Sequence, residues 1–167
     1  MIIEFEMIQE YYGKRVAERS HVPLIQHIRE GLYIMVEEQA TELAKQAYCL
    51  HPIFQSDEAL QANYNNSEYL KIDSNVMLLV MEYRNIANAY LSNKQITNIS
   101  EIQLSPLAEV NSMLVADKIQ NYKDFEKYHK ATHPRSKELT YYFENWLVRL
   151  GVTQEKYFHY RSLLEEE

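Results

Sequence analysis

The sequence predicts an all-α protein, and three observations carry this prediction. Only three Gly and four Pro occur in 167 residues, too few for the tight turns that an all-β or α/β chain of this length requires. The chain contains no Asn-Gly or Asp-Gly pair and no convincing alternation of apolar and polar residues. Apolar residues recur instead at spacings of three and four, which is typical of helices with one buried face. We therefore expect a single domain of about seven to eight helices.

The helices of the first half follow from this spacing and from the residues at their ends. Gly31 lies inside the second helix, where it costs about 1 kcal/mol relative to Ala and so indicates close packing by another helix. Pro52 lacks a backbone donor and is expected to stop or kink the third helix. Ser56 is a suitable N-cap for the fourth. The predicted ranges are Ile3–Arg15, Pro23–Glu37, Thr41–Leu50 and a helix that begins after Ser56.

The second half predicts four more helices. The first of them is the most apolar, and the second is long enough that we expect it to be bent or broken near its middle. Gly151 is placed to end the third. The polar residues 63–66 predict a loop, and residues 93–104 predict a connector. The four ranges are Ser74–Leu91, Leu107–Lys130, Lys137–Leu150 and Thr153–Glu166.

Composition excludes several classes of protein. Seventeen Lys and Arg against 24 Asp and Glu give a net charge of −7, which argues against a dedicated DNA or RNA binder. No apolar run is long enough to span a bilayer, so no membrane partner is expected. The single cysteine, Cys49, excludes a disulfide framework and a multi-thiolate metal site, and it fits a cytoplasmic protein. Fourteen tyrosines exceed what a core needs, so a pocket lining or a homo-oligomer interface stays open.

Three side chains on separate predicted helices are candidate metal ligands. His27 and His51 offer imidazole nitrogens, and imidazole is the commonest metal ligand in proteins. Asp117 lies between apolar residues, and a buried carboxylate needs a cation or hydrogen-bond donors in contact with it. Each of the three, taken alone, is more simply explained as a core residue with its polar atoms satisfied or as a partly exposed residue. Together they are a suitable ligand set for a divalent metal, but their spacing alone does not decide between the two explanations.

Motifs around these residues resemble those of a known family. They are Arg19-Ser20-x-x-Pro23-x-Ile25-x-His27, Ala47-Tyr48-x-Leu50-His51, and Leu114-Val115-Ala116-Asp117-Lys118-Ile119-x-Asn121-x-Lys123-Asp124. The chain resembles the RelA/SpoT-type alarmone hydrolases, in which an all-helical HD-type domain holds one divalent metal. The third motif is the most specific and the second the weakest. The resemblance covers about residues 13–125, so that helices within 134–167 would extend a single HD-like domain spanning 1–167.

The resemblance implies a nucleotide phosphohydrolase in which a metal-bound water attacks a phosphoanhydride or phosphoester, as in (p)ppGpp-like alarmones. It implies His27, His51 and Asp117 as the metal ligands, with Mn²⁺ as the first expectation and Fe²⁺ or Zn²⁺ as alternatives. The residues that it implies for binding the nucleotide substrate are Arg19, Ser20, Lys118 and Asn121.

The chain departs from the family where water would be activated. Pro52 stands where the family carries an Asp ligand, directly after His51. The family's Glu-Asp pair falls on Gln55 and Ser56, and Gln55 can orient a water but cannot take its proton. Asp57 or Glu58 could fill this catalytic role after a local shift. The alternative for Asp57 is a favourable charge at a helix N-terminus.

Two further features stay open. Arg84 could bind a substrate phosphate or pair with Glu82 or Asp117. A basic-aromatic cluster could reach the phosphates of a nucleotide or form a solvated face; its members are Tyr122, Lys123, Tyr128, His129, Lys130, His133, Arg135 and Lys137.

The sequence leaves three functions open. The first is an HD-type nucleotide phosphohydrolase. The second is a catalytically inactive HD-fold protein that binds a nucleotide signal to sense or sequester it. The third is a helical interaction protein with a vestigial site.

Overall fold

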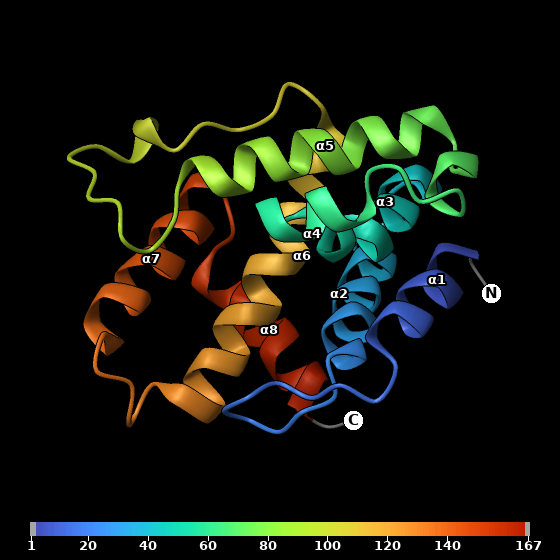
Figure 1. Cartoon of the computed structure of the whole chain (residues 1–167). Helices are drawn as coiled ribbons and strands as arrows, with labels where there is room; N and C mark the ends of the chain where they lie inside the picture. Colours follow the sequence, from blue (N-terminus) through green and yellow to red (C-terminus); the bar gives the residue numbers. More distant parts are fainter. Residues whose placement is uncertain (1–2, 166–167) are drawn as a thin grey trace.

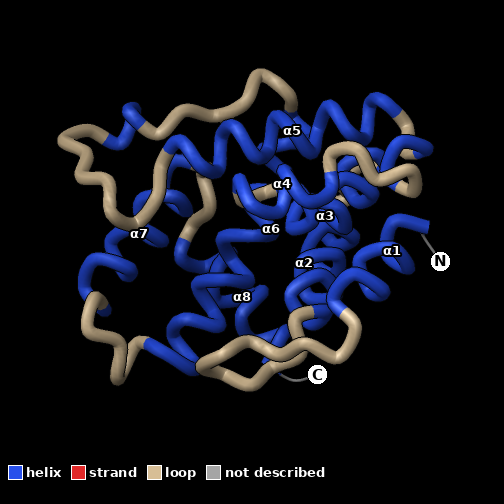
Figure 2. Tube along the Cα trace, viewed as in Figure 1, coloured by secondary structure: helices blue, strands red, loops and turns tan. Residues whose placement is uncertain are grey.

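A computed structural model describes residues 3–165, and over these residues the chain forms eight α-helices and no strand (Figures 1 and 2). The all-α prediction is therefore confirmed. The helices are α1 (Ile3–Tyr12), α2 (Ile25–Glu37), α3 (Glu42–Phe54), α4 (Asp57–Asn63), α5 (Ser74–Ala89), α6 (Ala108–Asp124), α7 (Ser136–Arg149) and α8 (Gln154–Glu165). Short 3₁₀ segments, η1 (Tyr69–Lys71) and η2 (Ile99–Glu101), flank α5, and a π-helical segment, η3 (Phe125–His129), extends α6.

Helix α6 is the centre of the fold. It packs against α2, α3, α5, α7 and α8, and Figure 1 shows it running through the middle of the molecule. The helices packed around α6 bury its apolar side chains. They also bury four of its polar or charged side chains: Asp117, Lys118, Gln120 and Lys123. A helix that carries charges into a core needs partners for each of them. Those partners form the site described below.

Helix α3 continues through Pro52 instead of stopping at Leu50. The prediction of a helix end there was wrong, because one missing N–H and a local distortion cost only about 3 kcal/mol and the buried residues of this last turn offset that cost. His51, Ile53 and Phe54 are all buried. Pro52 thus lies inside the helix, and the Tyr48 carbonyl four residues earlier lacks its usual backbone donor.

Gly31 lies where α2 and α3 meet. A Cβ atom at this position would come within 2.0 Å of the Tyr48 hydroxyl oxygen, so the close packing predicted for Gly31 is confirmed.

Helix α6 is continuous through its middle, where we expected a bend or break. The irregularity comes at its end instead, where η3 widens the helix. The Lys130 N–H donates to the Phe125 carbonyl at 2.7 Å, a bond across five residues. Such π-helical turns are rare and occur frequently at functional sites. In the chain, η3 is followed by the connection to α7.

The last two helices share the core of the rest of the protein. Trp146 and Leu147 of α7 and Tyr157 and Tyr160 of α8 are buried in it. Gly151 separates these helices with φ +74°, the left-handed conformation that glycine adopts at helix ends. Among the described residues, no helix is long and apolar enough to cross a membrane.

Candidate metal centre

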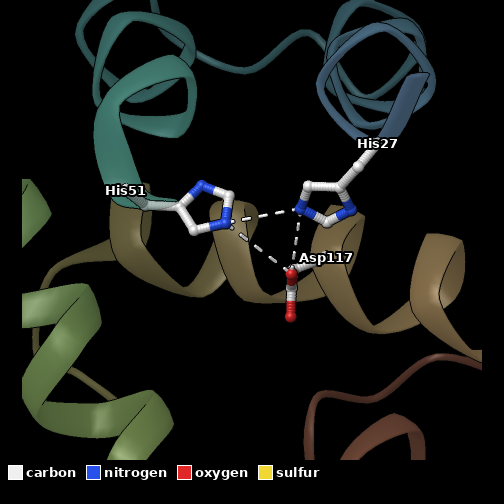
Figure 3. A group of neighbouring side chains, drawn as sticks. All are labelled: His27, His51 and Asp117. Atoms are coloured by element: carbon white, nitrogen blue, oxygen red, sulfur yellow. Dashed lines mark hydrogen bonds and ion pairs between the residues drawn. The ribbon is translucent and has the colours of Figure 1, made fainter. Parts of the chain in front are cut away.

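His27, His51 and Asp117 meet at one point, each from a different helix (Figure 3). His27 comes from α2, His51 from α3 and Asp117 from α6. The Nε2 atoms of the two histidines lie 3.4 Å apart. Asp117 Oδ1 lies 3.5 Å from Nε2 of His27 and 3.9 Å from Nε2 of His51. The group predicted from the sequence is therefore assembled by the fold.

The spacing of these three atoms suits a metal ion. A triangle with sides of 3.4, 3.5 and 3.9 Å has a centre about 2.1 Å from each corner, and this is the length of bonds from Zn²⁺ to histidine nitrogen and carboxylate oxygen. A slightly larger ion would sit just above the plane of the triangle. Two imidazoles and one carboxylate are a common ligand set for transition metals.

The backbone of α3 fixes the orientation of His51. Its Nδ1 lies 2.6 Å from the Tyr48 carbonyl oxygen, the oxygen that Pro52 leaves without a helical N–H. A carbonyl oxygen only accepts, so Nδ1 carries the proton and the lone pair of neutral His51 is on Nε2, facing the centre.

A buried polar network fixes His27 in the same way. The Gln120 amide nitrogen donates to Glu30 at 3.0 Å and to Asp124 at 2.8 Å, which leaves its carbonyl oxygen toward His27 Nδ1 at 2.6 Å. That nitrogen therefore carries the proton, and Nε2 of His27 also presents a lone pair to the centre. Lys123 pairs with Glu30 at 2.5 Å and with Asp124 at 2.8 Å, so one ammonium group bridges the two carboxylates of this network.

Asp117 is held as a carboxylate by its neighbours. Lys118 Nζ lies 2.8 Å from Oδ2, and the Asn121 amide donates to Oδ1 at 2.8 Å. Burial alone would raise the pKa of Asp117, but the Lys118 charge and then the two imidazoles outweigh it and lower the pKa to about 2. Asp117 is only 3 % exposed and is therefore a buried anion near neutral pH.

The three atoms at the centre are thus all acceptors, with no donor among them. Burial, and then the charge that His27 would carry, lower the pKa of His51 to about 3, so His51 does not relieve this crowding of lone pairs by taking up a proton near neutral pH. Beside His51 lies the Tyr83 ring, 4.7 Å away between centroids. Burial, and then the negative charge of Asp117, raise the pKa of Tyr83 well above its usual value. Three converging lone pairs are a suitable donor set for a metal cation.

The centre lies in the wall of a cavity of about 540 Å³. His27 is the most accessible of the three ligands, with 20 % of its side chain exposed. Among the residues that we expected to bind substrate or to orient water, those that line this cavity are Arg19, Ser20, Gln55, Lys118 and Asn121. Pro52 also lines it.

Asp57, Glu58 and Arg84 lie outside this cavity lining. Asp57, whose side chain is 89 % exposed, forms an ion pair with Arg84. Within residues 3–165, Arg84 has no ion pair with Glu82 or Asp117. Glu58 is exposed in the first turn of α4, where hydrogen bonds with its own backbone N–H and with Ser56 lower its pKa. Ser56 caps this helix through the Ala59 N–H at 3.0 Å, as expected.

The basic-aromatic cluster is divided by the fold. His129 and His133 line the cavity, whereas Lys123 is buried in the network beneath it and Tyr122 stacks on Phe143. Sequence reasoning missed Gln120, although it lies three residues after Asp117 on the same face of α6, where a metal ligand's partner would lie. It also missed Tyr83 and Glu30, for which the sequence contains no local signal.

Comparisons of the chain with protein-family models, with curated proteins and with solved structures find no match. What this centre does is therefore inferred from its own residues.

Proposed function

We propose that the protein is a metal-dependent phosphohydrolase of HD type that acts on a nucleotide, with (p)ppGpp-like alarmones as the first substrates to test. One observation carries the proposal: two imidazoles with fixed lone pairs and one carboxylate converge in the wall of a cavity large enough for a nucleotide. Mn²⁺ is the first metal to test, followed by Fe²⁺ and Zn²⁺. A divalent ion at such a centre lowers the pKa of a water ligand from about 15.7 to near 7 and so supplies a nucleophile at neutral pH.

The chain's own residues divide the remaining work. Arg19 is exposed at the cavity and suits a phosphate or a base. Asn121 fixes Asp117 through Oδ1 and lines the cavity, so it can contact the ribose or a phosphate as well. Lys118 is buried, 5.3 Å from the Trp146 ring centre, and its ammonium group orients Asp117 through Oδ2.

Among the described residues, the cavity lining offers no free carboxylate for proton transfer. Gln55 lines the cavity but only orients a water, and both oxygens of Asp124 are already held by Gln120 and Lys123. The imidazoles of His129 and His133 are the other lining groups that can exchange a proton. The lack of a free carboxylate favours a second candidate function, in which the same centre captures a nucleotide without hydrolysing it.

A turnover assay separates the two functions. Dialysed protein is supplied with Mn²⁺, Fe²⁺ or Zn²⁺ and a panel of nucleotides that includes ppGpp, and released phosphate and pyrophosphate are measured. The hydrolase predicts metal-stimulated release that His51→Ala abolishes. His159→Ala, which removes an exposed imidazole from α8, and Asp57→Asn should both retain activity.

Absence of release with every metal and nucleotide would exclude the hydrolase. A nucleotide that raises the melting temperature without product formation would then support capture, since a ligand at 100 times its Kd adds about 2.7 kcal/mol to the free energy of unfolding. If there is neither phosphate release nor a thermal shift, the remaining function is that of a helical interaction protein with a vestigial site.

A further inference from the structure

The cavity contains a second set of polar groups besides the metal ligands. Arg19, His129 and His133 line it, although Arg19 lies more than a hundred residues from the two histidines in the chain. In Figure 1 the connection that carries Arg19, between α1 and α2, runs beside the end of α6 from which η3 continues.

Backbone hydrogen bonds hold each of these residues in place. The Ala17 N–H donates to the Val22 carbonyl at 2.9 Å, and the Leu24 N–H donates to Arg15 at 3.0 Å, so Arg19 lies at the tip of a small closed loop. On the other side, η3 ends at His129, whose carbonyl accepts the His133 N–H at 2.8 Å.

The cationic groups around this wall differ in whether they are neutralised. Lys130 pairs with Glu126 and Arg135 with Glu138, while no ion pair within residues 3–165 engages Arg19, His129 or His133. In a chain with a net charge of −7, three cationic or donor groups without carboxylate partners on one cavity wall indicate an anionic ligand.

His133 presents a donor at neutral pH. Its Nδ1 accepts the Arg135 N–H at 3.0 Å, so the neutral ring carries its proton on Nε2. Partial burial, and then the charges of Arg19, His129 and Arg135, lower the pKa of His133, which keeps this tautomer in place. An Nε2–H donor beside a guanidinium suits a phosphate oxygen.

We propose that Arg19, His129 and His133 form a phosphate subsite in this cavity, separate from the metal ligands. The ligand class is a phosphate or pyrophosphate group, either on a bound nucleotide or free after its release. Placing that group on a substrate rests on the proposed function, but anion binding by the wall does not.

The test measures pyrophosphate and nucleoside diphosphate affinity by calorimetry on the chelator-dialysed full chain. His133→Asn is the central variant, because the Asn side-chain oxygen can still accept the Arg135 N–H while the Nε2–H donor is removed. Arg19→Gln removes the charge, and Lys137→Gln is the matched control because it removes one positive charge from an exposed position outside the cavity lining.

We expect His133→Asn and Arg19→Gln each to weaken binding about tenfold, as loss of one charge-assisted hydrogen bond does. Lys137→Gln should change the affinity by less than about twofold, since exposed charges act weakly. Binding of the nucleoside diphosphate would indicate that the subsite holds a phosphate group of a nucleotide. Binding of pyrophosphate alone would indicate that the subsite holds the free anion after its release.

The subsite would be overturned if all three variants lost the same amount of affinity for these anions. It would also be overturned if His133→Asn and Arg19→Gln lost none. Mn²⁺ affinity is measured on the same samples and should be unchanged in His133→Asn. A wild-type chain that binds pyrophosphate but no metal would overturn the proposed hydrolase while supporting this subsite, so the two failures are distinguishable.

Discussion

His51 Nδ1 lies 2.6 Å from the carbonyl oxygen of Tyr48, one turn earlier in the same helix. That carbonyl is free to accept because Pro52 lacks the N–H that would normally bond to it. Pro52 thus leaves the Tyr48 carbonyl to His51 Nδ1, and the Nε2 atom of His51 lies toward His27 and Asp117.

Pro52→Ala tests this role. The new N–H competes with His51 for the Tyr48 carbonyl, so we expect Mn²⁺ affinity to fall about tenfold, the lower end of the range for a lost partner of a metal ligand. The free energy of unfolding should rise at the same time, by up to about 3 kcal/mol, because a helix-interior proline is removed. Calorimetric titration and urea unfolding measure the two quantities. A variant that gains both stability and metal affinity would contradict this role.

Pro52→Asp is the matched comparison, since it also restores the N–H but adds a carboxylate at a position that lines the cavity. We expect it to bind Mn²⁺ about tenfold more tightly than Pro52→Ala, because an added anionic ligand favours a divalent ion. Equal affinities of the two variants would show that position 52 does not reach the metal.

Gln120→Leu should weaken metal binding about tenfold or more, because His27 would lose the acceptor that fixes its tautomer. Gln26→Leu is the control, as Gln26 contacts the same Glu30 at 3.4 Å, whereas the His27 ring nitrogens contact Gln120 and His51. Titration with Mn²⁺ measures the metal affinity of both variants. A comparable loss of affinity in the two would mean that Gln120 acts only through the stability of the network.

Gly31→Ala should destabilise the protein by about 1–3 kcal/mol, the usual cost of overpacking, because the added Cβ overlaps the Tyr48 ring. Chemical denaturation measures this loss. Combining the substitution with Tyr48→Leu removes the clash and should make Gly31→Ala nearly neutral in that background. If the loss persists there, its cause is not the contact with Tyr48.

Lowering the pH should destabilise the metal-free protein already at pH values well above those at which its carboxylates titrate. Folding lowers the pKa of His51 from 6.5 to about 3, so the unfolded chain binds a proton that the folded chain refuses. The free energy of unfolding therefore falls as the pH drops below 6.5, by about 2 kcal/mol at pH 5. The Asp117 contribution persists until the pH falls from about 4 toward 2.

Urea unfolding between pH 7 and pH 4.5 checks this profile. His51→Gln should flatten it, and His159→Gln should leave it unchanged. An equally steep profile in His51→Gln would assign the acid sensitivity to other groups.

The fold was largely predictable because its signals are local. Apolar spacing and the caps at Ser56 and Gly151 depend on neighbours in sequence, and they predicted the helices to within a few residues. Pro52 misled the prediction because the burial that offsets its cost comes from residues distant in the chain. The π-helical turn after Asp124 likewise depends on packing that no local pattern encodes.

The candidate centre was predictable in its ligands and not in their support. His27, His51 and Asp117 became candidates because polar residues on apolar helix faces need partners, and the motifs around them singled out these three. The Glu30–Lys123 pair and the orientation of Gln120 depend on contacts between α2 and α6. Asp57 was a reasonable candidate by position, but its helix begins at the surface, where Arg84 lies within reach.

The most direct measurement is a Mn²⁺ titration of the chelator-dialysed full chain, followed by calorimetry or by the loss of the free-ion electron paramagnetic resonance signal. The account predicts one ion per chain in the wild type and in His159→Ala, and loss of that ion in His27→Ala, His51→Ala and Asp117→Asn with the fold retained by circular dichroism. Wild-type protein that binds no Mn²⁺, Fe²⁺ or Zn²⁺, or three variants that bind as well as the wild type, would contradict it.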